Sequence, residues 1–394
     1  MARSAPSPGV RAVIGREWLR LRADRWDWWM LTWIPLLVYA FTWSIFAVGI
    51  ARELPIAVVD QDGTSLSRTL VRMLRASPGI AVVPVDTTDE AVHLMRARRV
   101  FGLVLVPAGL DNKVNTGRSA EVLWLYNGQY QAHVGPLTRD VQTVVTTFAV
   151  GAELTAHEKR GTSPLQALAA AQPVQVQTEN LFNETGSYEA FLTLSLLPAL
   201  LQILVAVAGA VGVGRELRYA TVPQWLAAAG GSWTAALVGK LAIPFACFAV
   251  QAVLFIAVFG GLRGWKVQGS GVMLVAGLLL LILACLAAGA FLSAVLLSMR
   301  DALSLCAFYT APAFAFAGQS YPVQDMPKLA RIWAEGLPLT HYLQLQTRHW
   351  MEGAPWQYGV HQLAVLALFT LGFGGLTLVL LKMRAMAPTA WGRL

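Results

Sequence analysis

Residues 55–78 read PIAVVDQDGTSLSRTLVRMLRASP, which is the pattern of a water-soluble fold within an otherwise apolar chain. The β-branched apolar run at 56–59 predicts a buried strand, and DQDG at 60–63 predicts a turn. Either Thr64 or Ser65 can cap the helix that follows. Its apolar residues recur at helical spacing: Leu66, Leu70, Met73 and Leu74.

The same alternation continues to residue 159. Apolar runs predict strands at 80–85, 100–106 and 122–126, and helical spacing predicts helices at 89–98 and 134–159. Strands that alternate with helices indicate an α/β or α+β domain. The D-x-D-G turn also resembles the start of a calcium loop, but its twelfth position holds a valine instead of the glutamate that such loops require. We therefore interpret it as a turn and predict no metal site.

The chain as a whole has the composition of a membrane protein. Of its 394 residues, 56% are hydrophobic and 13% are charged, against about 25% charged in soluble proteins. A spanning helix needs about 20 mainly apolar residues. We expect six spans, at residues 30–50, 191–213, 241–260, 272–297, 303–318 and 360–381, of which the fifth is short. The first is interpreted as an uncleaved signal anchor, because no A-x-A cleavage site follows it.

Basic residues in the loops between the spans indicate which side of the membrane each loop faces. Residues 1–29, 214–240, 298–301 and 382–394 together hold 13 basic and 5 acidic residues, whereas the other loops hold 17 of each. Because cytoplasmic loops carry an excess of Lys and Arg, both ends of the chain are predicted to be cytoplasmic. This topology accounts for the net charge of +8, so no nucleic-acid partner is needed to explain it.

The sequence thus predicts an α-helical polytopic membrane protein with six spans, both termini inside, and a mixed α/β extracytoplasmic domain between spans one and two. In order, its parts are a cytoplasmic interfacial helix (1–29), the first transmembrane helix (30–50), the extracytoplasmic domain (51–187) and a five-helix transmembrane domain (188–394). The last part includes a cytoplasmic loop at 214–240 and an outer re-entrant or interfacial segment at 319–345.

Several separated motifs resemble those of ABC-2 type permeases, the membrane subunits of bacterial ABC exporters. Residues 55–83, followed by FGLVLVP at 101–107, resemble the family's extracytoplasmic pattern VVDxDxSxxSR and its GxxxIP-like strand. REWLRLRADRWDWWMLTWIPL at 16–36 resembles the family's N-terminal interfacial helix and first span. FAGQSYPVQDMPKLARIWAEGLPLTHYLQ at 316–344 resembles the signature after the fifth span. The order of the parts, one span, an ectodomain and five spans, agrees as well.

The resemblance implies a transport subunit that is not an enzyme and binds no cofactor of its own. The sequence agrees, because it contains no G-x-x-x-x-G-K-[ST] motif. ATP and magnesium would then be used by separate ATP-binding cassette subunits on the cytoplasmic face. The resemblance also implies a dimer with a second permease copy or a paralogue, and a periplasmic adaptor protein is a further candidate partner besides membrane lipid.

Two cytoplasmic elements are the candidates for coupling to such an ATPase. The loop at 214–240 resembles the family pattern E-R-E-x-G-T-L-E-x-L, although Ala220 replaces its glycine and Pro223 its acid. The N-terminal helix is the second element, and a role as a plain anchor stays open for it. The candidate coupling residues are Arg16, Glu17, Arg215, Glu216, Thr221, Gly239 and Lys240.

The N-terminal helix also has features of an interfacial helix. An apolar stripe along it is opposed by arginines, which is typical of a helix on the membrane surface, and tryptophans follow where it meets the bilayer. The stripe is Val10, Ile14, Trp18 and Leu21, and the tryptophans are Trp26, Trp28, Trp29 and Trp33.

The segment after the short fifth span predicts a helical hairpin at the outer leaflet, with Met326, Leu329, Ala330 and Trp333 on one face. Backbone of this kind is tolerated where protein buries it or where it lines a cavity. Both an outer gate and a structural plug are consistent with this pattern. The candidate gate residues are Gly318, Pro322, Met326, Pro327, Trp333 and Pro338.

Small and ionisable residues in the spans bear on mechanism. Runs of small residues at 209–214, 287–289 and 372–375 predict close helix packing. Ionisable residues are almost absent, with Lys240 and Asp301 at span ends, which argues against an ion-coupled carrier. An apolar pathway favours an amphipathic drug, lipid or lipid-linked substrate. The alternative is a membrane-anchored receptor or assembly scaffold whose periplasmic domain binds a ligand and which transports nothing.

Overall fold

The computed structural model describes residues 7–47, 53–116, 118–128, 131–159 and 187–392. Residues 48–50 of the first predicted span and 160–186 of the predicted ectodomain lie outside these ranges. The chain forms two compact units. The sheet unit comprises the described residues of Val48–Asn180 and Glu184–Tyr188, and the helical unit comprises those of Met1–Ala47 and Glu189–Leu394.

The sheet unit is built on a mixed four-stranded sheet with the strand order β2–β1–β3–β4. Its strands are β1 (Leu54–Asp60), β2 (Ile80–Pro84), β3 (Gly102–Val106) and β4 (Leu123–Tyr126). Strand β1 pairs in parallel with β2 and β3, with Val58 opposite Pro84 on one side and Val104 on the other, and β4 is antiparallel to β3. The four strands predicted from the apolar runs are confirmed.

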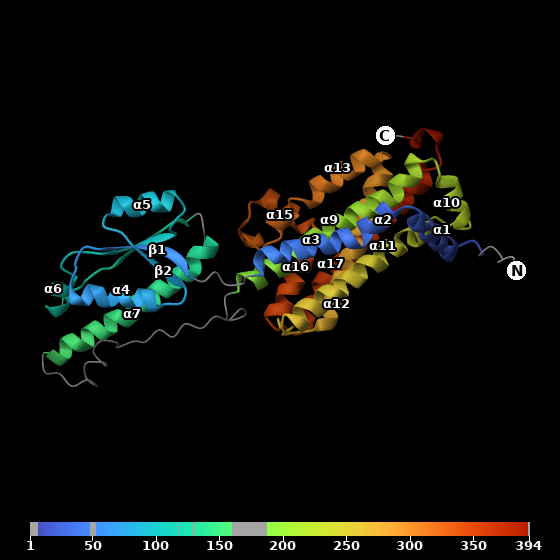
Figure 1. Cartoon of the computed structure of the whole chain (residues 1–394). Coiled ribbons are helices and arrows are strands. Elements are labelled where there is room, and N and C mark those ends of the chain that lie inside the picture. The colour runs from blue at the N-terminus through green and yellow to red at the C-terminus, as the bar shows by residue number, and fades with distance from the viewer. Residues whose placement is uncertain (1–6, 48–52, 117, 129–130, 160–186, 393–394) are drawn as a thin grey trace. The chain divides into compact units, whose positions relative to one another are not determined.

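Helices cover both faces of this sheet (Figure 1). They are α4 (Ser65–Ala76), α5 (Thr88–Arg96), α6 (Leu110–Asn115) and α7 (Gln131–Lys159). Successive side chains of a strand point to opposite faces. Accordingly, Ile56 and Val58 pack with α4, α6 and α7, whereas Ala57 and Val59 pack with α5. Burial on both faces explains why β1 reads as a continuous apolar run. Of the four helices described here, the short helix α6 was not predicted.

The D-x-D-G sequence forms a turn whose carboxylates are engaged by the protein itself. Asp60 accepts hydrogen bonds from the backbone amides of Asp62 and Gly63, each at 3.0 Å, and from the Ser67 hydroxyl at 2.8 Å. The Thr64 hydroxyl accepts the Ser67 amide at 3.2 Å and thereby caps α4. The interpretation as turn chemistry and the predicted cap are both confirmed.

Asp62 joins this turn to the start of α6. Its carboxylate accepts hydrogen bonds from the Thr64 hydroxyl at 2.6 Å and from the Gly109 amide at 2.8 Å. Burial alone would raise the pKa of Asp62, but the hydrogen bonds from Thr64 and from the amides of residues 109–111 outweigh that effect and hold its pKa below the ordinary value. The charged form of Asp62 therefore stabilises the turn.

Within the described residues, the helical unit has five helical segments that are long and apolar enough to cross a membrane. They are Arg25–Phe46, Glu189–Arg218, Trp233–Leu262, Gly271–Leu296 and Gln357–Arg384. In terms of single elements these are α2 (Arg25–Leu31) with α3 (Trp33–Phe46), α9 (Tyr188–Arg218), α11 (Trp233–Ile256) with η2 (Ala257–Leu262), α12 (Gly271–Leu296) and α17 (Gln357–Arg384). Five of the six predicted spans coincide with them, so the chain is a multi-pass membrane protein.

Glycines set the closest approach between two of these helices. A Cβ at Gly209 on α9 would lie 2.2 Å from the Leu286 carbonyl oxygen, and one at Gly289 on α12 would lie 1.9 Å from the Ala206 carbonyl oxygen. Small residues allow helix backbones to approach in this way in membranes. The packing predicted for the first two runs is confirmed. For Gly372, Gly374 and Gly375 it is wrong within this chain, because a Cβ added at any of the three would meet nothing within 4 Å.

The predicted fifth span, residues 303–318, is not one helix. Helix α13 (Met299–Thr310) ends just before Pro312, which lacks the amide needed to continue it, and α14 (Ala313–Phe316) follows. The broken segment nevertheless runs antiparallel along α9. Met299 lies by Gly214, Gln202 donates a hydrogen bond to the Thr310 carbonyl at 3.1 Å, and farther along both segments Ser195 donates one to Gln319 at 3.0 Å.

Two hydrophobic clusters mark opposite ends of the helical unit. One cluster joins the N-terminal helix α1 (Val10–Ala23) and the short helix α10 (Val222–Ala228) to the end of α17; we call this the α10 end. The other joins the beginnings of α9 and α12 to η4 (Thr347–Met351). Figure 1 shows α1 and α10 close together at the first of these ends.

We predict that Gly289→Ala destabilises the helical unit by about 1–3 kcal/mol or more, because the new methyl group meets backbone that cannot rotate away. Gly374→Ala adds the same methyl group on α17 where nothing lies within 4 Å, so it serves as the matched control. Thermal denaturation in mild detergent, followed by size-exclusion chromatography, measures both. An equal midpoint for Gly289→Ala and Gly374→Ala would contradict the close packing of α9 on α12.

Candidate functional site

The candidate site begins with the way α1 packs on α11. A Cβ at Gly239 would lie 2.6 Å from the Cβ of Val13, so only glycine allows α1 to lie this close. The face of α1 that packs inward carries Val13, Glu17 and Leu21, all of which are buried. The predicted interfacial stripe lies on a different side of the helix, where Val10 and Trp18 remain exposed, and shares only Leu21 with the inward face. The inward face includes a glutamate, which a search for apolar residues passes over.

Lys240, one position after this glycine, lies at the centre of a buried ionic cluster. Its ammonium group donates to Glu17 Oε1 at 2.6 Å and to Glu216 Oε1. The three side chains are 1%, 2% and 3% exposed, respectively. They come from α11, α1 and α9, so a single ammonium group links three helices that are distant in the sequence. The ring of Trp225 on α10 lies 5.9 Å from the same ammonium group.

The two carboxylates have further partners. Arg16 donates both of its terminal guanidinium N–H groups to Glu216, at 2.8 and 2.9 Å, in a bidentate pair. The Thr221 hydroxyl, just before α10, donates to Glu216 Oε2 at 2.6 Å. Glu17 accepts a hydrogen bond from Arg20 Nε at 2.9 Å. Both buried carboxylates are thus neutralised and hydrogen-bonded on each oxygen.

A second group of charges extends the cluster to α2. Asp27 accepts a hydrogen bond from Arg20 at 2.6 Å and a bidentate pair from Arg215, of which the Nη2–Oδ1 distance is 2.6 Å. Asp24, which caps α2 by accepting the Trp26 amide at 3.0 Å, lies 3.9 Å from Arg215. The whole group of four basic and four acidic side chains, which we call the ionic cluster, is electrically neutral.

The ionic cluster makes separation of its helices costly. Removing one member of a buried pair leaves a charge without its partner and costs about 3–5 kcal/mol. Separation of α1 from α9 or α11 would therefore leave buried charges unpaired, and Asp27 extends the same ion pairing to α2. The arrangement suits mechanical transmission between helices.

The structure brings together all seven candidate coupling residues. Six are members of the ionic cluster or bond to it, and the seventh, Gly239, allows the approach of α1. Two expectations are corrected. Residues 214–240 are mainly helical, with only short connections around α10, and Lys240 lies on the second turn of α11 instead of at the end of a span. The helices extend past their apolar runs because ion pairing neutralises the charges there. Sequence reasoning did not assign Arg20, Asp24 and Asp27 to this site.

The replacement of a glycine by Ala220 has a visible consequence. Ala220 adopts φ +57°, in the left-handed region where glycine has no steric penalty. The turn between α9 and α10 therefore keeps the left-handed backbone conformation that glycine would favour, although Ala220 carries a methyl group that glycine lacks. Pro223 lies at the second position of α10, where its missing amide leaves no hydrogen bond unmade.

The candidate gate residues lie along one hairpin packed on α13. Its helices are η3 (Val323–Asp325), α15 (Lys328–Glu335) and α16 (Pro338–Gln346). Met326 and Pro338 are buried, and Trp333 contacts the rings of Phe308 and Tyr309. Gly318, Pro322 and Pro327 mark the turns of this hairpin. Of the predicted apolar face, Met326 is buried, whereas Leu329 is 83% exposed. A gating role for these residues stays a prediction.

Comparison with known proteins adds independent findings. A family model described as "ABC-2 family transporter protein" matches residues 25–379. The chain is similar to the inner membrane transport permease YhhJ of Escherichia coli (strain K12), with 21% identity over 360 residues that cover 89% of this chain and 92% of the relative. It is similar to the permease of the same name from Shigella flexneri, with the same identity and coverage.

We predict that Lys240→Met lowers stability by about 3–5 kcal/mol, because it leaves the buried carboxylates of Glu17 and Glu216 without their shared cation. The double variant Lys240→Met/Glu17→Gln removes one charge of each sign and should recover more than half of that loss. Thermal denaturation of the purified chain measures both effects. Arg300→Gln, at an exposed arginine of α13, should change stability by less than about 0.5 kcal/mol. A Lys240→Met protein as stable as the Arg300→Gln control would contradict the buried ionic cluster.

Proposed function

Because the chain belongs to the ABC-2 family of transporter proteins, we propose that it is the permease subunit of an ATP-driven exporter. It moves an amphipathic or lipid-like molecule outward across the bacterial inner membrane. ATP and magnesium are used by two separate ATP-binding cassette subunits. The permease acts as a dimer, either with a second copy of itself or with a paralogue.

The proposal includes six membrane crossings with both termini in the cytoplasm. The sixth crossing is made by the broken segment α13–α14. Its supporting observation is the antiparallel run along α9 between Gly214 and Ser195, which corresponds to about 28 Å of helix at 1.5 Å per residue. That length matches a hydrocarbon core of about 30 Å. The excess of basic residues supports a cytoplasmic location for the α10 end and a periplasmic location for the sheet unit.

The ionic cluster is the single observation that carries the coupling proposal. The α10 end is where a cytoplasmic ATPase would press, and α10 is exposed there at Pro223, Gln224 and Ala227. Force on α10 reaches Glu216 through Thr221. From Glu216 it reaches Lys240 on α11 and Arg16 on α1. An isolated anchor would have no need of a buried, fully paired cluster at this position.

The sheet unit and the apolar interior complete the proposal. Buried side chains of the helical unit are mainly Leu, Ala and Val, so a substrate that passes between its helices meets apolar surface and is itself apolar over most of its area. The periplasmic sheet unit extends the exit path or docks an adaptor protein. The competing function, a receptor or scaffold that transports nothing, differs in having no ATPase partner.

The test is affinity purification of the tagged chain in mild detergent, followed by identification of co-eluting proteins and an ATPase assay. We expect an ATP-binding subunit to co-elute. Ala227→Arg, on the exposed face of α10, should reduce its recovery about tenfold, which corresponds to 1.4 kcal/mol. Leu329→Arg, at an exposed position of α15, is the matched control and should leave recovery unchanged. A pure, monodisperse chain that elutes without any ATPase would favour the receptor or scaffold function.

A further inference from the structure

Helix α3 is attached to the helical unit by polar contacts near its two ends. Close to one end, the Trp43 indole N–H donates to Glu189 Oε1 at 2.9 Å, and Arg263 pairs with the same carboxylate at 3.0 and 2.6 Å. Next to its other end, the Gln251 side-chain amide donates to the Leu31 carbonyl at 2.8 Å. Between these contacts the helix is loosely packed, since Pro35 is its one buried residue.

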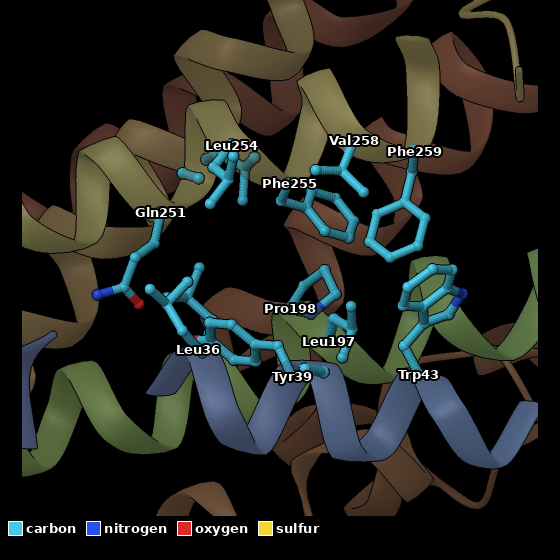
Figure 2. A pocket seen from close by; sticks show the side chains of 14 residues that line it. Leu36, Tyr39, Trp43, Leu197, Pro198, Gln251, Leu254, Phe255, Val258 and Phe259 are labelled. Atoms are coloured by element: carbon cyan, nitrogen blue, oxygen red, sulfur yellow. The ribbon is translucent and has the colours of Figure 1, made fainter. Parts of the chain in front are cut away.

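A cavity of about 310 Å³ lies between these two attachments (Figure 2). Helices α3, α9, α11 and α12 and the π-helical turn η2 form its walls. Most of its lining is apolar and includes Leu36, Leu201, Phe255 and Leu278. A second hollow of about 560 Å³ adjoins it on the side of α1 and shares Leu36 and Gln251 as lining residues. The first volume is at the lower end of the range of small-molecule sites, about 300–1,000 Å³.

Two buried polar atoms on the cavity wall have no hydrogen-bond partner among the described residues. They are the Tyr39 hydroxyl and the Gln251 side-chain oxygen, and Gln251 is 6% exposed. Because the Leu31 carbonyl can only accept, the amide nitrogen of Gln251 must face it. The oxygen is then left on the cavity side, and Figure 2 shows the nitrogen directed away from the other lining residues.

We propose that this cavity binds the transported molecule, an apolar compound that carries a hydrogen-bond donor such as a hydroxyl group. The side-chain oxygen of Gln251 accepts a hydrogen bond from that donor, because an amide oxygen can only accept. A buried acceptor left unpaired is unfavourable, so the site discriminates against ligands of the same shape without a donor. This inference rests on the proposed function and adds the binding site and the chemical class of the substrate.

The charges near the cavity exclude an anionic group from it. Among the described residues, the arginine beside its walls is Arg263, which already forms two hydrogen bonds with Glu189. A phosphate or carboxylate in the cavity would therefore meet apolar side chains, the acceptor oxygen of Gln251 and, as a donor, only the neutral Tyr39 hydroxyl, without a free cation among the described lining residues. The outer face of α3 carries Trp33, Leu37, Phe41 and Ile45, each more than half exposed. The ligand enters from the lipid phase along this helix.

The binding test uses a decanol that carries a diazirine on its chain, added to the purified full-length chain in mild detergent. After illumination, peptide mass spectrometry locates the labelled residues. Decanol and decyl methyl ether are compared as competitors at equal mole fraction in the micelle. We expect labelling on α3 and α11, with decanol competing about tenfold better than the ether. In Gln251→Met, which lacks the acceptor, this preference should fall below about twofold.

Filling the cavity gives a second readout. Val258→Phe places a ring in the cavity and should reduce labelling about tenfold, whereas Val253→Phe, at an exposed lipid-facing position of α11, should leave it unchanged. In the complex with the ATP-binding subunit, Val258→Phe should also abolish stimulation of ATP hydrolysis by decanol.

Labelling elsewhere, or equal competition by the ether, would overturn the proposed site whatever the ATPase result. Labelling with unaffected stimulation would show that the cavity holds a resident lipid, which overturns its assignment to the substrate. The proposed function is judged separately, by co-elution of the ATPase.

Discussion

The ammonium group of Lys240, shared between Glu17 and Glu216, is the contact on which the rest of the helical unit depends. A charge this deeply buried requires partners, and those partners come from helices that begin and end far apart in the chain. The requirement fixes where α1 lies, how closely it approaches α11 and where α9 ends. Gly239 is needed for the same ion pairs, because any larger residue at this position would push α1 and its Glu17 side chain away from Lys240.

The ionic cluster and the cavity are connected by a short series of contacts. Asp27, at the edge of the cluster, lies on α2. Four residues later Leu31 accepts the hydrogen bond of Gln251, the residue that also lines the cavity and faces it with an unpaired oxygen. A movement of α10 and α1 would therefore reach Leu31 and, through its hydrogen bond with Gln251, the wall of the cavity. In the proposed exporter, this is the route by which ATP hydrolysis alters the substrate site.

Much of the fold followed from local patterns in the sequence, and the exceptions have physical causes. Strands β1 to β4 were predicted from continuous apolar runs, and helices α4, α5 and α7 from apolar residues at helical spacing. The broken segment α13–α14 was read as one span because apolar residues continue through Pro312. The inward face of α1 was not predicted, because Glu17 is buried by ion pairing, which hydropathy does not register. The left-handed backbone conformation at Ala220 could not be predicted, because alanine does not favour it.

The candidate site was predictable as a set of residues but not as an arrangement. The coupling residues were identified one by one from the family resemblance, and nothing in their spacing showed that Lys240 would join three helices. Gln251, Glu189 and Arg263 were missed because each is a single polar residue within or next to an apolar run. A signal was present, since polar residues inside spans mark functional positions more often than chance.

The most direct test is the distance between spin labels at Leu19 on α1 and Tyr219 just after α9, both of which are exposed, within one permease subunit. It would be measured in the complex with its ATP-binding subunits, without nucleotide and with a non-hydrolysable ATP analogue. If the ionic cluster makes these helices one moving body, that distance stays constant, while the distance from α1 to a label on the lipid face of α3 changes. A change between Leu19 and Tyr219 on nucleotide binding would show that the cluster opens, and would contradict its role in transmission.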